Sequence, residues 1–224
     1  MKKTICLLSS AGLTATMSPI PAHADEYYYP SVSNGKRIYM SPARHSNSGS
    51  RGECNGVGEN TMAYWNARDA STGSTSSLTA RGYTVRLGTT TYQEAVTKSN
   101  AWGADRHIVL HSNAIGNVSC TKNSAAHGTW VIHYETSTTG RALANSIKNA
   151  MGPYSPGTGD RVCANPRDKC ISFTAYELRY TNAPAAYIEA DFHTWDVGAD
   201  WLWTNLAWQT RIAEGIDAQM GRPR

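Results

Sequence analysis

The stretch from residue 106 to residue 114 reads RHIVLHSNA, an apolar run followed at once by polar side chains. Ile108, Val109 and Leu110 are typical of a buried strand, and His111 comes directly after them. Open α/β sheets bind their ligands in the crevice beyond the carboxyl ends of the strands. A titratable ring at that position predicts a functional site around His111.

Strands and helices alternate on both sides of this stretch. We expect strands at residues 37–40, 83–87, 106–110, 128–134 and 185–189, and helices at residues 59–80, 92–102, 139–150 and 196–220. Residues 152–169 are rich in proline and glycine and predict a long loop, a kind of segment that is often functional. The alternation predicts an α/β fold with an open, mostly parallel sheet and helices on both faces.

Length and composition favour one globular catalytic domain. The chain has 224 residues, of which 40% are hydrophobic and 17% are charged, and these values exclude a disordered chain and a coiled coil. Its formal charge of +4 includes Lys2 and Lys3 of an apparent leader, so the mature chain carries +2. This charge is too small to indicate nucleic acid as a partner.

The beginning of the chain has the layout of a secretory signal peptide. Two lysines precede an apolar stretch over residues 4–17, and small residues suit cleavage after Ala24. We therefore expect a signal peptide at residues 1–24 and a single catalytic domain at residues 25–224. No later segment reaches the roughly 20 apolar residues that span a bilayer. The mature protein is predicted to be secreted, extracellular and monomeric.

Four cysteines remain once the leader is removed, an even number in a compartment that permits disulfides. Cys163 and Cys170 flank a short polar loop, and their nearness makes them the natural first pair, which leaves Cys54 to bond Cys120. A structural metal site needs closely spaced pairs such as Cys-x-x-Cys, and the sequence has none. We therefore expect two disulfide bonds.

Three more side chains that bind metals or protons lie near the ends of predicted elements. His45 follows the first strand, Glu59 opens the first helix, and Glu189 ends the last strand. Taken singly, Glu59 also fits an acid that the helix dipole favours, and His45 a solvated loop histidine. A carboxylate that ends a buried strand is costly unless it is paired or coordinated, which favours a role for Glu189. Carboxyl ends of parallel strands meet at one edge, so these groups are expected to converge with His111.

We assign no primary role to the other histidines of the mature chain, which are His107, His127, His133 and His193. Of these, His127 and His193 are candidates to reach a substrate.

Seven short motifs in order resemble the zinc-dependent N-acetylmuramoyl-L-alanine amidases of the amidase-3 type, over nearly the whole mature chain. They are the strand followed by His45, Gly58-Glu59, Ala80 to Leu87, Ser99 to Asp105, Leu110 to Ala114, Gly128-Thr129-Trp130 and Ile188-Glu189. The resemblance implies a Zn²⁺ site at the carboxyl ends of the strands, with His45, Glu59 and His111 as ligands. It implies that Glu189 is the catalytic carboxylate.

This resemblance also implies an activity. The expected enzyme is a peptidoglycan hydrolase that cleaves the amide bond between N-acetylmuramic acid and L-alanine, with the glycan strand and the stem peptide as its partners. Three protein ligands leave one zinc position for water. Glu189 would then take a proton from that water and pass it to the departing L-alanine nitrogen.

One motif departs from the family. Members usually have Asp-Pro-Gly-His-Gly-Gly around the first ligand, whereas residues 41–46 here read SPARHS. Arg44 therefore stands beside a predicted zinc ligand, where we expect it to alter substrate approach. The departure keeps open a non-catalytic wall-binding module on the same scaffold. A third interpretation keeps the metal but changes the bond, as in a zinc peptidase or deacetylase that acts on a different wall bond.

Overall fold

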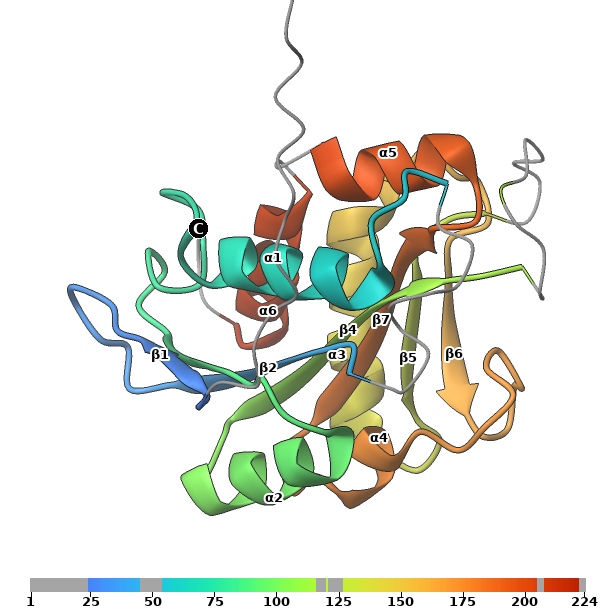
Figure 1. Cartoon of the computed structure of the whole chain (residues 1–224). Helices are drawn as coiled ribbons and strands as arrows, with labels where there is room; N and C mark the ends of the chain where they lie inside the picture. Colours follow the sequence, from blue (N-terminus) through green and yellow to red (C-terminus); the bar gives the residue numbers. More distant parts are fainter. Residues whose placement is uncertain (1–23, 45–53, 116–119, 121–126, 205–207, 222–224) are drawn as a thin grey trace, which may run out of the picture.

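A computed structural model describes residues 24–44, 54–115, 120, 127–204 and 208–221 of the chain. Within these residues seven strands form one sheet in the order β1-β3-β2-β4-β7-β5-β6 (Figure 1). The strands are β1 (Glu26–Tyr28), β2 (Arg37–Pro42), β3 (Thr84–Leu87), β4 (Arg106–Asn113), β5 (Trp130–Tyr134), β6 (Arg161–Asn165) and β7 (Ala185–Phe192). β1 pairs with β3 and β5 pairs with β7 in antiparallel fashion, and the other four pairs are parallel.

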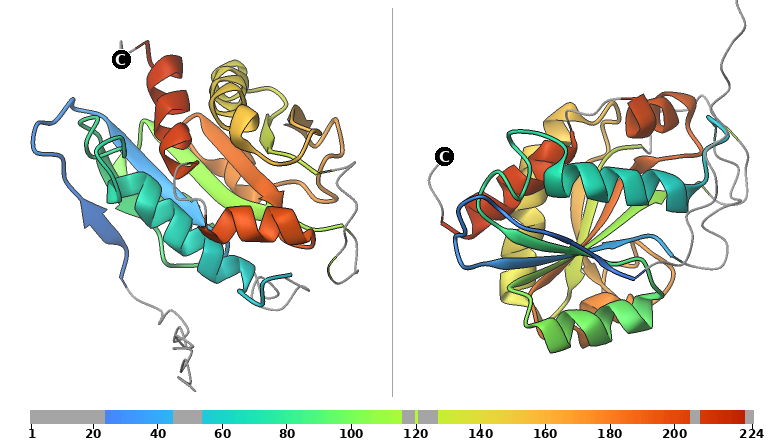
Figure 2. Two further views of the ribbon diagram at one scale, coloured as in Figure 1. Left: turned by 90° about the horizontal axis from the view of Figure 1, so that it is seen from above. Right: turned by 60° about the vertical axis from the view of Figure 1, so that its left-hand side comes forward.

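Helices cover both faces of the sheet, which confirms the predicted open, mostly parallel α/β fold (Figure 2). On one face lie α1 (Glu59–Thr72), α3 (Thr138–Met151), α5 (Asp196–Thr204) and α6 (Gln209–Gln219), and on the other lie α2 (Tyr92–Trp102) and α4 (Tyr176–Tyr180). A one-turn 3₁₀ helix, η1 (Gly152–Tyr154), follows α3. None of the described helices is long and apolar enough to cross a membrane.

Successive residues of the central strands contribute to two different cores. Leu110 of β4 packs in the larger core under α1, α3 and α6, whereas Val109 packs in the smaller core that includes Leu178 of α4. Because side chains alternate along a strand, His111 points to the same face as Val109. Glu189 follows the same rule on β7, since Tyr187 belongs to the smaller core.

The central strands run further than their apolar runs predict. β4 continues through His111 to Asn113, so His111 lies within the strand and does not merely follow it. β7 likewise continues past Glu189, and β2 continues through Ser41 and Pro42, beyond its predicted end at residue 40. Neighbouring strands supply the backbone hydrogen bonds that carry these polar residues into the sheet.

Two predicted helices are shorter than expected. The helix at residues 59–80 ends at Thr72, where Gly73 and a run of serine and threonine give way to turns. The segment 196–220 forms α5 and α6 as separate helices. The predicted loop at residues 152–169 contains the strand β6, and neither β1 nor α4 was predicted.

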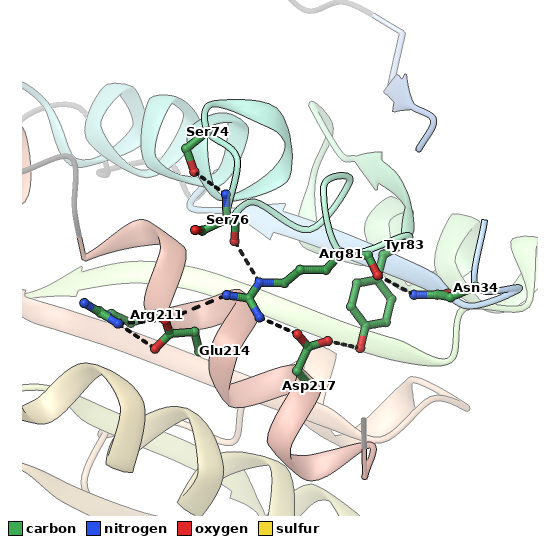
Figure 3. Close-up of polar contacts among 8 residues, drawn as sticks. All are labelled: Asn34, Ser74, Ser76, Arg81, Tyr83, Arg211, Glu214 and Asp217. Carbon is green, nitrogen blue, oxygen red and sulfur yellow. Dashed lines mark hydrogen bonds and ion pairs between the residues drawn. The ribbon is translucent and has the colours of Figure 1, made fainter. Parts of the chain in front are cut away.

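A group of paired polar side chains fastens α6 to the turns before β3 (Figure 3). Arg81 Nη1 donates to Asp217 Oδ2 at 2.5 Å, and the Tyr83 hydroxyl donates to Asp217 Oδ1 at 2.7 Å. Glu214 Oε1 lies 3.7 Å from Arg81 Nη2, and Arg81 Nε donates to the Ser76 carbonyl oxygen. Every one of these charges has a partner of opposite sign, as buried charges require.

Candidate active site

A cavity of 750 Å³ opens where β2, β4 and β7 end. Its walls come from these strand ends, from the first residue of α1, from residues 170–175 and from the starts of α2 and α4. This is the crevice in which open α/β sheets bind their ligands. Three of the predicted site residues line it: Glu59, His111 and Glu189.

Glu59 and His111 are in direct contact although 52 positions separate them in the chain. His111 Nδ1 lies 3.0 Å from Glu59 Oε1, and the backbone nitrogen of Ser112 donates to the same oxygen at 3.1 Å. Both side chains are buried. The imidazole of His111 also stacks on Tyr187, with ring centroids 4.6 Å apart. The start of α1 lies beside the end of β4, and this position brings its first side chain, Glu59, into contact with His111.

Glu189 stands opposite His111 in the register of β4 and β7, so the two side chains are neighbours on one face of the sheet. Burial raises the pKa of the Glu189 carboxyl well above its usual range, and repulsion from Glu59 raises the pKa further. Its Oε2 is buried and accepts no hydrogen bond from the described residues. Glu189 therefore offers an open acceptor in the cavity.

The predicted zinc ligands are described only in part. His45 lies outside the described residues, and within them no group of three His, Cys, Asp or Glu side chains is arranged to hold a metal ion. Glu59 and His111 offer one carboxylate and one imidazole in contact at a buried strand end. Zinc takes nitrogen and oxygen donors of these kinds, so the chemistry of this pair fits a zinc ion.

One of the two disulfides among the described residues reaches the cavity wall, and the other contacts a lining residue. Cys54 is joined to Cys120 and Cys163 to Cys170, with Cα–Cα distances of 4.9 Å and 6.3 Å. Cys170 itself lines the cavity. The backbone nitrogen of Cys54 donates to the His193 carbonyl oxygen at 3.0 Å.

His193, treated as secondary in the sequence, also lines the cavity. Its Nδ1 lies 2.8 Å from Ser112 Oγ, and its backbone nitrogen donates to the Asn113 carbonyl oxygen. The sequence indicated this position, because His193 follows Glu189 by four residues near the end of the same strand. His127 is different: it is fully buried, stacks on Trp195 and does not line the cavity.

A third buried carboxylate of the cavity was not predicted from the sequence. Glu177 of α4 lines the cavity and accepts a hydrogen bond from Ser41 Oγ at 2.5 Å, while His107 Nε2 lies 3.0 Å from the same carboxylate oxygen. The contacts fasten α4 to β2 and β4. Nothing local in the sequence signals them, because the helix has five residues and its partners lie 136 and 70 positions away.

The helix that Glu177 holds carries an aromatic part of the wall. Tyr176 packs edge-on against Tyr92 of α2, with centroids 5.6 Å apart, and both line the cavity together with Phe173. All three side chains are exposed. Arg44 is a further lining residue, and burial lowers the pKa of its guanidinium group.

Known proteins share both the sequence pattern and the fold. The family model of the N-acetylmuramoyl-L-alanine amidases, Amidase_3, matches residues 45–220. No curated protein sequence matches the chain.

Several solved amidase structures are similar to this fold. The catalytic domain of CwlV, an N-acetylmuramoyl-L-alanine amidase from Bacillus (Paenibacillus) polymyxa var. colistinus, is 20% identical with a TM-score of 0.66, covering 84% of this chain and 99% of that domain. An amidase from Clostridium difficile 630 gives the same identity, TM-score and share of this chain, and 96% of its own chain is covered. Ami1 from Mycobacterium smegmatis is 13% identical with a TM-score of 0.63, covering 85% and 99%. With the amidase fold in place and the family model matched over most of its length, the chain belongs to the Amidase_3 family of N-acetylmuramoyl-L-alanine amidases.

Proposed function

We propose that the protein is a secreted, zinc-dependent peptidoglycan hydrolase that cleaves the amide bond between N-acetylmuramic acid and L-alanine. The observation that carries the proposal is the juxtaposition of three side chains in one cavity: His111 opposite Glu189, and Glu59 in contact with His111. Membership of the amidase family supports this bond over others in the wall.

The roles of the residues follow from their surroundings. Glu59 and His111, with His45 from outside the described residues, would hold the zinc ion. A zinc ion held there would polarise an amide carbonyl and lower the pKa of a water molecule. Ser112 fixes the Glu59 carboxylate through its backbone nitrogen, and Tyr187 holds the His111 ring by stacking.

Glu189 is the proposed proton carrier. Its Oε2 accepts the proton of the attacking water, and the same carboxyl group then donates that proton to the departing L-alanine nitrogen. Cleavage separates the glycan strand from the stem peptide. Export through a signal peptide at residues 1–24 places the mature domain, as a monomer, where this substrate occurs.

Metal analysis combined with mass analysis of digested muropeptides tests the proposal. We expect one zinc ion per chain after reconstitution, and its loss in His111→Ala, because two ligands hold the ion poorly. His133→Ala serves as the matched control, since this histidine lies on β5 and does not line the cavity. Products should carry a new muramic acid lactyl carboxyl group and a free L-alanine amine.

Two other results of these measurements would support the two alternative functions. A wild-type protein that takes up no stoichiometric zinc would be a wall-binding module. A zinc protein that releases different products would be a peptidase or a deacetylase.

A further inference from the structure

Arg44 brings a cationic side chain into the cavity directly after β2. Its Nε and Nη2 atoms are buried, and neither has a hydrogen-bond partner in the part of the chain that the structure describes. A buried charge without a partner destabilises the folded state. The partner of this guanidinium group therefore lies outside the described residues, and a substrate that enters the cavity can supply it.

Other arginines of the fold show what a satisfied guanidinium group looks like here. Arg81 pairs with Asp217, and Arg86 Nε donates to Asp25 Oδ2 at 2.7 Å. These two side chains are only 18% and 14% exposed, and each meets a carboxylate. Arg44 lines the same cavity as three carboxylates, yet within the described residues it pairs with none of them.

The chemistry of the neighbouring donors indicates the class of ligand. Asn113 Nδ2 is a second buried donor of the cavity wall that has no acceptor among the described residues. The cavity wall thus presents a guanidinium fork and an amide donor, and donors of these kinds match the oxygens of a carboxylate.

We propose that Arg44 binds a carboxylate of the peptide part of the substrate and so determines specificity for anionic stem peptides. The inference rests on the proposed function, because a peptidoglycan substrate supplies the carboxylate. The sugars of the glycan strand carry uncharged hydroxyl and acetamido groups. The peptide, in contrast, carries carboxylates along its length and at its end. Arg44 takes the place of a glycine in the family's usual motif, so this specificity would belong to this chain.

Three probes distinguish the two carboxylates that the stem peptide offers to Arg44: the side carboxylate of its second residue and its C-terminal carboxylate. Each probe is a soluble N-acetylmuramoyl tripeptide: one with both carboxylates free, one with the side carboxylate of the second residue converted to an amide, and one with the C-terminal carboxylate converted to an amide. Binding is measured by calorimetry to zinc-loaded protein that carries Glu189→Gln, so that the probes are not cleaved. The same measurement is made after adding Arg44→Gln, Arg44→Lys or, as an exposed control on α3, Arg141→Gln.

We expect Arg44→Gln to weaken binding of the fully anionic probe by about 10- to 100-fold, the usual effect of a charged hydrogen-bonded pair. Arg44→Lys should retain part of the affinity, and Arg141→Gln all of it. The effect of Arg44→Gln should vanish for the one probe whose contacted carboxylate has become an amide, and that probe identifies the source.

A stability measurement excludes a purely structural role. Removing an unpaired buried charge should leave the unfolding temperature of Arg44→Gln unchanged or higher, whereas a structural role would lower it. If Arg44→Gln binds every probe as tightly as the protein that keeps Arg44 does, or loses the same affinity for all three probes, the carboxylate assignment alone is overturned. If no probe binds while Arg44 is intact, the assignment and the proposed function both fail.

Discussion

Two regions of this protein differ in whether their buried polar and charged groups have partners. Around Asp217, at the junction of α6 with the turns before β3, each charged group meets a partner (Figure 3). In the cavity, Arg44, Asn113 and Glu189 each bury a polar atom that has no partner among the described residues. Because an unsatisfied buried group destabilises the fold, it is tolerated where a substrate completes it. The paired charges around Asp217 therefore hold elements of the fold together, and substrate binding and proton transfer are assigned to the unpaired charges of the cavity.

The largest effect is expected at the unpaired carboxylate. Glu189→Gln keeps the size of the side chain but cannot accept a proton, so hydrolysis should fall by about 10²- to 10⁴-fold. Zinc content should stay near wild type, because Glu189 is assigned to proton transfer. Activity on muropeptides and metal content are measured on the same preparation. Loss of zinc instead would make Glu189 a ligand, and unchanged activity would remove it from the mechanism.

The two disulfides at the cavity differ in how much chain they close. The Cys54–Cys120 bond spans 66 positions and the Cys163–Cys170 bond spans 7. Loop-closure entropy then predicts a loss of about 4 kcal/mol in the free energy of unfolding when the first bond is removed by serine substitution, and about 2 kcal/mol for the second. Urea unfolding of the two double variants compares them. A mature protein whose non-reducing peptide map pairs Cys54 with any cysteine other than Cys120 contradicts the premise.

Local chemistry explains which elements the sequence predicted well. α2 has the predicted bounds because both of its ends are decided by neighbouring residues. Thr91 caps its first turn by accepting a hydrogen bond from the backbone nitrogen of Glu94, and Gly103 ends it at a φ of 67°. β6 and α4 were missed because partners distant in sequence stabilise them: β6 pairs with β5, and Glu177 holds α4.

The cavity residues also differ in whether neighbouring residues in the sequence or distant packing partners reveal them. His111 and Glu189 were visible in the sequence because apolar strands lead up to them, and strand ends of an α/β sheet converge. Arg44 was visible only as a departure from a family motif. That two of its nitrogen atoms are buried with no partner among the described residues depends on the packing of several elements, and no spacing of residues in one chain segment encodes such packing.

The paired region should respond in stability and not in catalysis. Asp217→Ala leaves the half-buried Arg81 with Glu214 as its more distant carboxylate partner, so the free energy of unfolding should fall by about 3 kcal/mol. Activity per folded molecule should be unchanged. Asp200→Ala, on the exposed side of α5, is the control and should alter neither quantity. A drop in activity at a temperature where Asp217→Ala remains folded would show that the two regions are coupled.

The smallest expected effect concerns Asp25, a buried carboxylate that contrasts directly with Glu189. Arg86 Nε donates to its Oδ2 at 2.7 Å, Lys98 Nζ to its Oδ1 at 3.0 Å and the Tyr39 hydroxyl to its Oδ2 at 3.2 Å. Burial alone would raise the pKa of Asp25, but the hydrogen bonds and charges of Lys98 and Arg86 outweigh burial and lower the pKa below its ordinary value of 3.8.

The sign of the pH dependence follows from that lowered pKa. The unfolded chain takes up a proton at Asp25 more readily than the folded one, so the stabilisation is complete above pH 3.8 and is lost as the pH falls through the lower folded-state value. Asp25→Asn should therefore reduce the free energy of unfolding by about 1–2 kcal/mol at pH 7. Urea unfolding at pH 7 and at pH 3 should show this difference narrowing in acid, with the exposed Glu135→Gln as the control. A difference that persists or widens in acid would mean that Asp25 acts through packing, and that cationic partners do not explain its place in the fold.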